Sequence, residues 1–273
     1  MSPPDLFLLH LGTSSWTSEG WQGTFYPANI PESQWITHYA KKFSTVEVDA
    51  TFYHAPSRKT VQGWRDRTPE GFLFAAKVPQ TITHERFLLD CGKETTGFLD
   101  TMSILGSRLG PILFQFPYHA RRTGVGLPEF LERVKTFLPG LPSEGFKFAV
   151  EVRNKTWLQE PLLSLLSEHR IALALIAHPW MYRPGDLFRL EGVVTAPFVY
   201  IRWLGDRRKI EEITTRWDRT VIDREENLRE WAGPVRDLLE RGVEVYGYVN
   251  NHYSGYAPAD VERLVGILKE TGS

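Results

Sequence analysis

The chain has 273 residues, of which 42% are hydrophobic and 24% charged, the composition of a globular protein long enough to bury a full core. Its 32 basic residues nearly balance its 33 acidic residues, so the formal charge of -1 excludes a global field that attracts polyanions. A single cysteine, Cys91, excludes an internal disulfide and a cysteine-cluster metal site. With nothing to indicate an oxidising compartment, we expect a cytoplasmic protein.

The N-terminal segment, residues 1–11, has no basic region, and its apolar run passes directly into Gly12-Thr13-Ser14. We therefore interpret it as a first strand and not as a signal peptide. No apolar stretch approaches the roughly 18 residues that a membrane span needs, so we expect no membrane partner.

Short apolar runs alternate with longer amphipathic segments along the whole chain. Eight runs are candidate strands: residues 7–13, 45–51, 72–78, 111–116, 146–153, 171–177, 198–203 and 243–250. Seven segments are candidate helices: residues 33–42, 57–67, 93–107, 128–137, 156–169, 223–241 and 258–269. Several of these have recognisable ends, such as Ser57 as an N-cap and Gly242 after the long helix.

Strands that alternate with helices predict parallel pairing and right-handed crossovers. Eight such units in a chain of this length favour a closed (β/α)8 TIM barrel, in one domain of residues 1–273, over an open doubly wound sheet. Residues 14–31 and 178–197 contain no convincing helix. Their aromatic content predicts ordered loops, which in compact domains are commonly functional.

Polar residues occur at the ends of most predicted strands, where the chemistry of a barrel is located. We expect seven of them to line one cavity: Glu47, Lys77, Gln115, Glu151, Arg153, Arg202 and Asn250. Three are candidate catalytic residues: Glu47, Lys77 and Glu151. The candidate substrate contacts are Trp16, Trp21, Tyr26, Tyr53, His84, Gln115, Arg153, Arg202, Asn250 and Asn251.

Each of these residues also has a structural interpretation. Glu151 and Arg153 suit an ion pair that closes the barrel mouth, and Asn250 and Asn251 suit left-handed turn positions. The rings of the loop at residues 14–31 suit packing within the loop as well as stacking on a ligand. The sequence leaves these alternatives open.

Metal and nucleotide chemistry have little support in the sequence. Glu47, Asp49, Glu151, His84 and His252 carry atoms that bind metals, but no tight motif such as HExxH occurs, and we predict no metal site. There is no glycine-rich phosphate loop and no GxSxG elbow, so nothing favours nucleophilic serine chemistry, and the sequence does not identify a cofactor.

Short motifs along nearly the whole chain resemble those of the DUF72 family, the YecE-like proteins of unknown function. They are Gly12-Thr13-Ser14, Phe25-Tyr26-Pro27, Thr45-Val46-Glu47, Thr51-Phe52-Tyr53, Thr83-His84, Glu151 with Arg153, Tyr200 to Arg202, and Asn250-Asn251-His252. The resemblance implies a TIM barrel with a polar pocket of unassigned activity, similar in outline to endonuclease IV and the sugar isomerases.

The chain departs from the family pattern at three positions. Ser15 stands where the family usually has glycine, while Asn154 and Leu204 stand where it tends to have histidine. The two missing histidines lower the expectation of a metal site further.

We therefore expect an enzyme that acts on a polar, anionic small molecule or a phosphodiester. Arg153, Arg202 and Lys77 would bind negative charge, and Glu47 or Glu151 would act as general acid or base. We expect Arg202 and Lys77 to be reserved for the ligand and to lack protein partners. The alternative is a protein that holds a ligand or nucleic acid without turnover.

Overall fold

The computed structural model describes residues 6–118 and 126–270; residues 1–5 of the N-terminal segment, which was interpreted as leading into a first strand, lie outside them. The strands are Leu9–Thr13 (β1), Thr45–Val48 (β2), Leu73–Lys77 (β3), Leu109–Gln115 (β4), Phe148–Glu151 (β5), Ala172–Ala177 (β6), Phe198–Trp203 (β7) and Glu244–Val249 (β8). The α-helices are Trp35–Tyr39 (α1), Arg58–Asp66 (α2), Gly92–Met102 (α3), Leu127–Phe137 (α4), Glu160–Glu168 (α5), Pro184–Leu187 (α6), Arg207–Glu211 (α7), Glu225–Glu240 (α8) and Ala257–Lys269 (α9).

The strand order is β1-β8-β7-β6-β5-β4-β3-β2, so consecutive strands from β2 to β8 are neighbours and the first strand pairs with the last. Leu9 lies opposite Val245 and Thr13 opposite Val249 in that parallel β1–β8 ladder. An open doubly wound sheet has no such pair, because its first strand lies in the interior of the order. The predicted (β/α)8 barrel fold is therefore confirmed.

The chain divides into two compact units. The first is drawn from Met1–Glu47, Leu175–Leu190 and Phe198–Ser273, and the second from Val48–Ala174 and Glu191–Pro197. In the first unit β8 pairs with β1 and β7. In the second unit β4 pairs with β3 and β5, and β5 pairs with the start of β6. All of these pairs are parallel.

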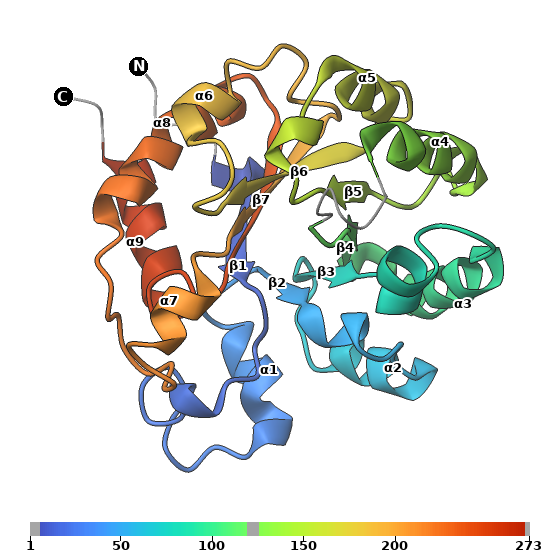
Figure 1. Cartoon of the computed structure of the whole chain (residues 1–273). Coiled ribbons are helices and arrows are strands. Elements are labelled where there is room, and N and C mark those ends of the chain that lie inside the picture. The colour runs from blue at the N-terminus through green and yellow to red at the C-terminus, as the bar shows by residue number, and fades with distance from the viewer. Residues whose placement is uncertain (1–5, 119–125, 271–273) are drawn as a thin grey trace. The chain divides into compact units, whose positions relative to one another are not determined.

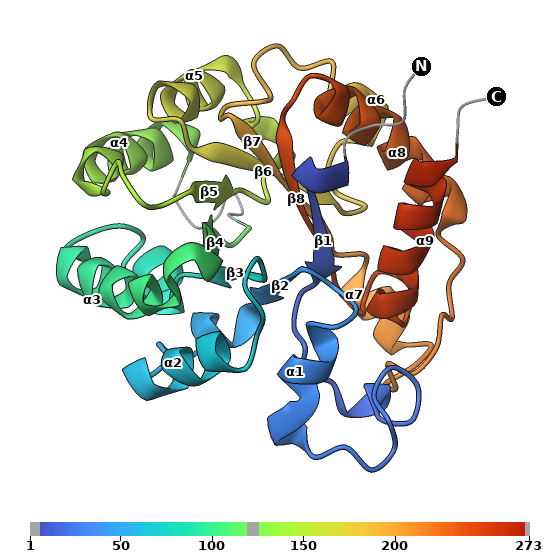
Figure 2. The ribbon, with the colours of Figure 1, turned by 180° about the vertical axis from the view of Figure 1, so that it is seen from behind.

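Helices α8 and α9 cover the strands of the first unit. They pack against each other, and α9 also contacts β1 and β8 (Figures 1 and 2). In α9 the buried residues Val261, Leu264 and Leu268 recur three and four positions apart, which places them on one face of the helix. This apolar stripe of the amphipathic segment faces the sheet.

Two predicted strands end two or three residues earlier than the sequence suggested. β2 ends at Val48, and Asp49 begins a 3-10 turn, Asp49–Phe52. β5 ends at Glu151, so Arg153 lies beyond it. The short helices α6 and α7 were not predicted, because one turn of helix is too short to show an apolar period. None of the helices in the described ranges is long and apolar enough to cross a membrane.

Gly12 marks a close approach of two backbone segments in the first unit. A Cβ added at Gly12 would lie 2.0 Å from the carbonyl oxygen of Thr45 and 3.0 Å from the hydroxyl oxygen of Tyr39. We therefore expect Gly12→Ala to lower the free energy of unfolding by about 2 kcal/mol or more, since backbone atoms must move. Urea unfolding measures the change.

Gly97→Ala is the matched control, because a Cβ at this exposed position in α3 meets no atom within 4 Å. It is expected to raise stability by about 0.5–1 kcal/mol, as alanine favours the helix over glycine. Equal effects of the two substitutions would contradict the close approach at Gly12.

Candidate functional site

Glu47 and Arg202 form a buried ion pair in the first unit. The Arg202 side chain donates to Glu47 Oε1 from Nε at 3.1 Å and from Nη2 at 2.7 Å. Glu47 is 0% and Arg202 1% exposed. The expectation that Arg202 lacks a protein partner is therefore wrong, because its charge is already matched by a carboxylate within the core.

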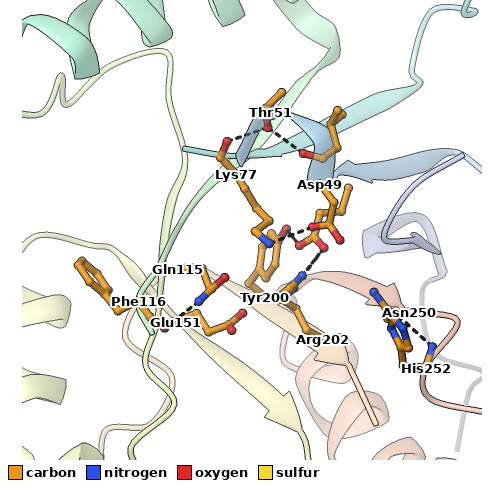
Figure 3. A network of polar contacts seen from close by, with 12 residues as sticks. Asp49, Thr51, Lys77, Gln115, Phe116, Glu151, Tyr200, Arg202, Asn250 and His252 are labelled. Carbon is orange, nitrogen blue, oxygen red and sulfur yellow. Dashed lines mark hydrogen bonds and ion pairs between the residues drawn. The ribbon is translucent and has the colours of Figure 1, made fainter. Parts of the chain in front are cut away.

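Two tyrosines extend this buried network. The Tyr200 hydroxyl donates to Glu47 Oε2 at 2.6 Å, and burial, followed by the nearby carboxylate, raises the pKa of Tyr200 well above its usual value. The Tyr248 hydroxyl lies 2.9 Å from Thr45 Oγ1, and burial raises its pKa as well. Both phenols therefore stay neutral and serve as hydrogen-bonding groups within the core. Figure 3 shows the Tyr200 side chain beside Arg202.

In the second unit, the lysine cluster comprises Lys77, Asp49, Phe52 and His84. Lys77 is the last residue of β3 and only 8% exposed, and its Nζ lies 3.2 Å from Asp49 Oδ1 and 4.7 Å from the centroid of the Phe52 ring. The expectation that Lys77 lacks a protein partner is therefore wrong as well. The His84 ring meets the Phe52 ring edge to face at 4.8 Å. The Thr51 hydroxyl donates to the Lys77 carbonyl at 2.7 Å and fixes the turn that carries Asp49 and Phe52 (Figure 3).

Gln115 and Glu151 lie opposite each other at the ends of β4 and β5. Lys77 lies opposite Leu113, two residues before Gln115, so all three polar side chains leave the same face of the sheet. The Gln115 amide nitrogen donates to the Phe116 carbonyl at 2.8 Å (Figure 3). Arg153 Nε donates to the fully buried Glu151 Oε1 at 2.9 Å, so the ion pair considered from the sequence is present.

The second unit thus presents hydrogen-bonding atoms that its own residues do not use. A lysine ammonium has three N–H donors, and Asp49 is the one carboxylate that pairs with Lys77 among residues 6–118 and 126–270. Within the same ranges the two terminal nitrogens of Arg153 have no partner, and its side chain is 41% exposed. Such donors, beside a buried carboxylate, suit an anionic ligand.

Two of the predicted aromatic contacts are enclosed by the protein. Trp21 and Tyr26 are each 1% exposed, and the Tyr26 ring stacks on Trp35 at 5.0 Å. The Tyr26 hydroxyl donates to the Trp16 carbonyl at 2.5 Å. The rings of Trp21 and Tyr26 are therefore not available to stack on a ligand, because the first loop uses them for its own packing.

The remaining predicted aromatic residues differ in exposure. Trp16 is half-buried in the first unit. Tyr53 is 61% exposed in the second unit, where its ring meets that of Phe52 at 5.3 Å. Tyr53 thus adjoins the lysine cluster through the same ring that lies under Lys77.

Asn250 and Asn251 organise the turn after β8. Asn250 Oδ1 accepts the backbone N–H of His252 at 2.9 Å (Figure 3). Asn251 Oδ1 accepts the indole N–H of Trp21 at 3.2 Å and the N–H of Ala257 at 3.1 Å, at the start of α9. These contacts give both side chains a structural role.

Ser15 has a backbone φ of 156°, a region that glycine favours. The glycine that the family usually has at this position would adopt this backbone conformation with less strain. The sequence did not predict a role for Phe52 or Tyr200, although both lie inside the motifs noted above. In the structure Phe52 belongs to the lysine cluster and Tyr200 to the buried network of Glu47.

In the described part of the chain no group of three or more histidine, cysteine, aspartate or glutamate side chains is arranged to hold a metal ion.

Comparison with known proteins gives a consistent result. The model of DUF72, described as a protein of unknown function, matches residues 10–273. UPF0759 protein YecE of Escherichia coli (strain K12) is 31% identical over 54% of this chain and 49% of its own length. UPF0759 protein YunF of Bacillus subtilis (strain 168) is 26% identical over 56% and 54%. These alignments span about half of the curated relatives.

Solved structures match this chain over a larger share of its length than the curated relatives do. The crystal structure of a DUF72 family protein from Thermotoga maritima has a TM-score of 0.73 and 27% identity, and the match covers 96% of this chain and 99% of the other. A DUF72 family protein from Enterococcus faecalis matches with a TM-score of 0.67 and 19% identity, over 97% and 96% of the two chains. Both support the barrel fold.

Proposed function

This chain belongs to the DUF72 family, and from that premise we propose that it is an enzyme that binds a small anionic molecule at the carboxyl ends of β3, β4 and β5. A phosphate ester or phosphodiester is the substrate class that this charge arrangement fits best. The ends of these strands are where barrel enzymes place their chemistry.

The observation that carries the proposal is the environment of Lys77. Its ammonium is almost fully enclosed, yet it contacts one carboxylate, that of Asp49, and the face of one aromatic ring, that of Phe52. A structural lysine is normally solvated or fully paired, since removing its charge from water without compensation is costly. A partly paired, enclosed ammonium is suited to hold an anionic group or to transfer a proton.

The neighbouring residues have complementary roles in this proposal. Lys77 and the outer edge of Arg153 bind the negative charge of the substrate, and an arginine edge can bind two oxygen atoms at once. Glu151, held by Arg153 Nε at 2.9 Å, is the general acid or base. Glu47, by contrast, is assigned to the buried pair with Arg202 and no longer to the chemistry.

The alternative is a protein that binds its ligand, or a nucleic acid, without turnover. The same contacts support it, because Lys77–Asp49 and Glu151–Arg153 are already ion pairs and need no reaction to explain them. Binding that is not accompanied by product formation would favour this alternative.

We expect Lys77→Met to abolish turnover of any phosphate ester or phosphodiester that the wild-type protein hydrolyses, in a panel followed by release of the alcohol. Stability should change by less than about 1 kcal/mol, because the partner Asp49 is 26% exposed and can be solvated. The assay therefore separates loss of function from loss of fold.

Lys93→Met is the matched control, since it removes the same charge from the exposed first turn of α3 in the same unit. It should leave activity unchanged. Full activity in the Lys77→Met protein would exclude Lys77 from the reaction.

A further inference from the structure

A cavity of about 300 Å³ lies wholly within the first unit and shares no residue with the lysine cluster. It is bounded by the segments that follow β6, β7 and β8 and by the first turns of α8. Met181, Tyr182 and Trp231 contribute to its walls, and Arg224, Asn227 and Tyr253 are among its polar lining residues. Nothing in the function proposed above uses these residues.

The Tyr253 hydroxyl is a buried group without a partner. Tyr253 is 3% exposed, and its oxygen makes no hydrogen bond with any residue of the described ranges. This oxygen is closed off from the cavity too, so other atoms of Tyr253 line the cavity. Burial also raises the pKa of Tyr253, which keeps the hydroxyl as a neutral donor.

The Arg224 guanidinium is held in place without a carboxylate. Its Nε donates to the backbone carbonyl of Tyr253 at 2.8 Å, and its guanidinium carbon lies 5.4 Å from the centroid of the Tyr253 ring. In the part of the chain that the structure describes, no carboxylate forms an ion pair with Arg224, and its two terminal nitrogens have no partner. The cation is thus oriented, and its outer edge is unoccupied.

The other charges on the cavity cancel each other. Glu230 also lines the cavity, and Arg183 binds it from Nε at 3.3 Å and through a second contact from Nη2. Among the residues that line the cavity, Arg224 therefore supplies the net positive charge; the buried Asp260, whose pKa Arg224 lowers, is not one of them. One arginine suits a single negative charge, whereas a doubly charged phosphate would face the Glu230 carboxylate with one cation to balance it.

We propose that this cavity binds a small organic carboxylate with an apolar or aromatic body. The carboxylate accepts two hydrogen bonds from the outer edge of the Arg224 guanidinium. The body of the ligand packs against Tyr182 and Trp231. A volume of about 300 Å³ is at the lower end of ligand pockets, which limits the ligand to about the size of a substituted benzoic acid.

Benzoate and its neutral counterpart benzamide are suitable probes for isothermal titration calorimetry. The wild-type protein should bind benzoate at least tenfold more tightly than benzamide, because only benzoate carries the charge that Arg224 recognises. Arg224→Met should weaken benzoate at least tenfold and remove this preference. Tyr253→Phe should keep the fold and bind benzoate like the wild type, since the hydroxyl that it removes is closed off from the cavity.

Two control variants keep the test specific. Arg241→Met removes an exposed charge at the other end of α8 and should leave benzoate binding unchanged. Lys77→Met should also leave it unchanged, because the lysine cluster is a different site in the second unit. The proposal is overturned if benzoate does not bind, if benzamide binds equally well, if Arg224→Met binds benzoate like the wild type, or if Lys77→Met abolishes binding.

Discussion

Replacement of Arg202 by methionine is expected to lower the free energy of unfolding by about 3–5 kcal/mol, which is the usual cost of removing one partner of a buried ion pair. Glu47 is 0% exposed and would keep its carboxylate in the core without the guanidinium that neutralises it. The Tyr200 hydroxyl would still donate to Glu47, but a neutral donor does not balance a charge. Urea unfolding followed by tryptophan fluorescence measures the loss.

The double variant Glu47→Gln with Arg202→Met provides the matched control. It should recover part of the stability lost in the single variant, because no unpaired charge is left in the core. Arg207→Met, which breaks a pair with Glu211 at a side chain 72% exposed, should cost less than about 1 kcal/mol. A loss in Arg202→Met as small as that in Arg207→Met would contradict the buried pair.

Asp260→Asn is expected to make the protein more stable at neutral and alkaline pH. Asp260 is 2% exposed, and burial raises its pKa to about 7 from 3.8, although Ser254, Arg263 and Arg224 act in the opposite direction. The folded protein therefore holds this proton more tightly than the unfolded chain does. Above pH 7, folding carries an ionised buried carboxylate, at a cost of about 4 kcal/mol for a shift of about three pKa units.

The sign of the pH dependence follows from this shift. The contribution of Asp260 to stability is greatest below about pH 4, falls between about pH 4 and 7, and stays at its minimum above about pH 7. The asparagine side chain of the variant cannot ionise and still offers an oxygen to the Ser254 hydroxyl, which donates to Asp260 in the wild type. The stability difference between variant and wild type should thus rise from near zero at pH 4 to a plateau above pH 7.

Unfolding in urea at several pH values gives this difference directly. Asp237→Asn, at an exposed position of α8, is the control and should show no comparable rise. A difference for Asp260→Asn that does not change between pH 4 and 8 would mean that the carboxylate titrates normally in the folded protein.

The sequence predicted the strands and the ends of several of them correctly, because parallel strands buried on both faces are short apolar runs with clear polar boundaries. Lys77, Gln115 and Glu151 each end a strand and share one face, as the alternation of side chains requires. The partner of Arg202 could not be predicted, since Glu47 lies 155 positions away and no local pattern joins them. Charge alone does not distinguish a ligand-binding arginine from one paired in the core.

The loop after β1 illustrates a second limit. Its rings suited both ligand stacking and packing, and Trp21 and Tyr26 pack within the first unit. Aromatic content predicted an ordered loop correctly, but which face of each ring is covered depends on contacts with α1 and with the turn after β8. The contact of Asp49 with Lys77 could not be predicted for the same reason. It depends on where β2 ends, because the end of the strand at Val48 turns the Asp49 side chain toward Lys77.

The central claim is that the carboxyl ends of β3, β4 and β5 bind an anion through Lys77 and Arg153. Isothermal titration calorimetry with inorganic phosphate, at fixed ionic strength so that screening does not imitate binding, tests it most directly. Phosphate should bind the wild-type protein and Lys93→Met equally, and bind Lys77→Met and Arg153→Met about tenfold to a hundredfold more weakly, since each loses a charge-assisted contact. Equal affinity in all four proteins, or no binding to the wild type, would contradict the claim.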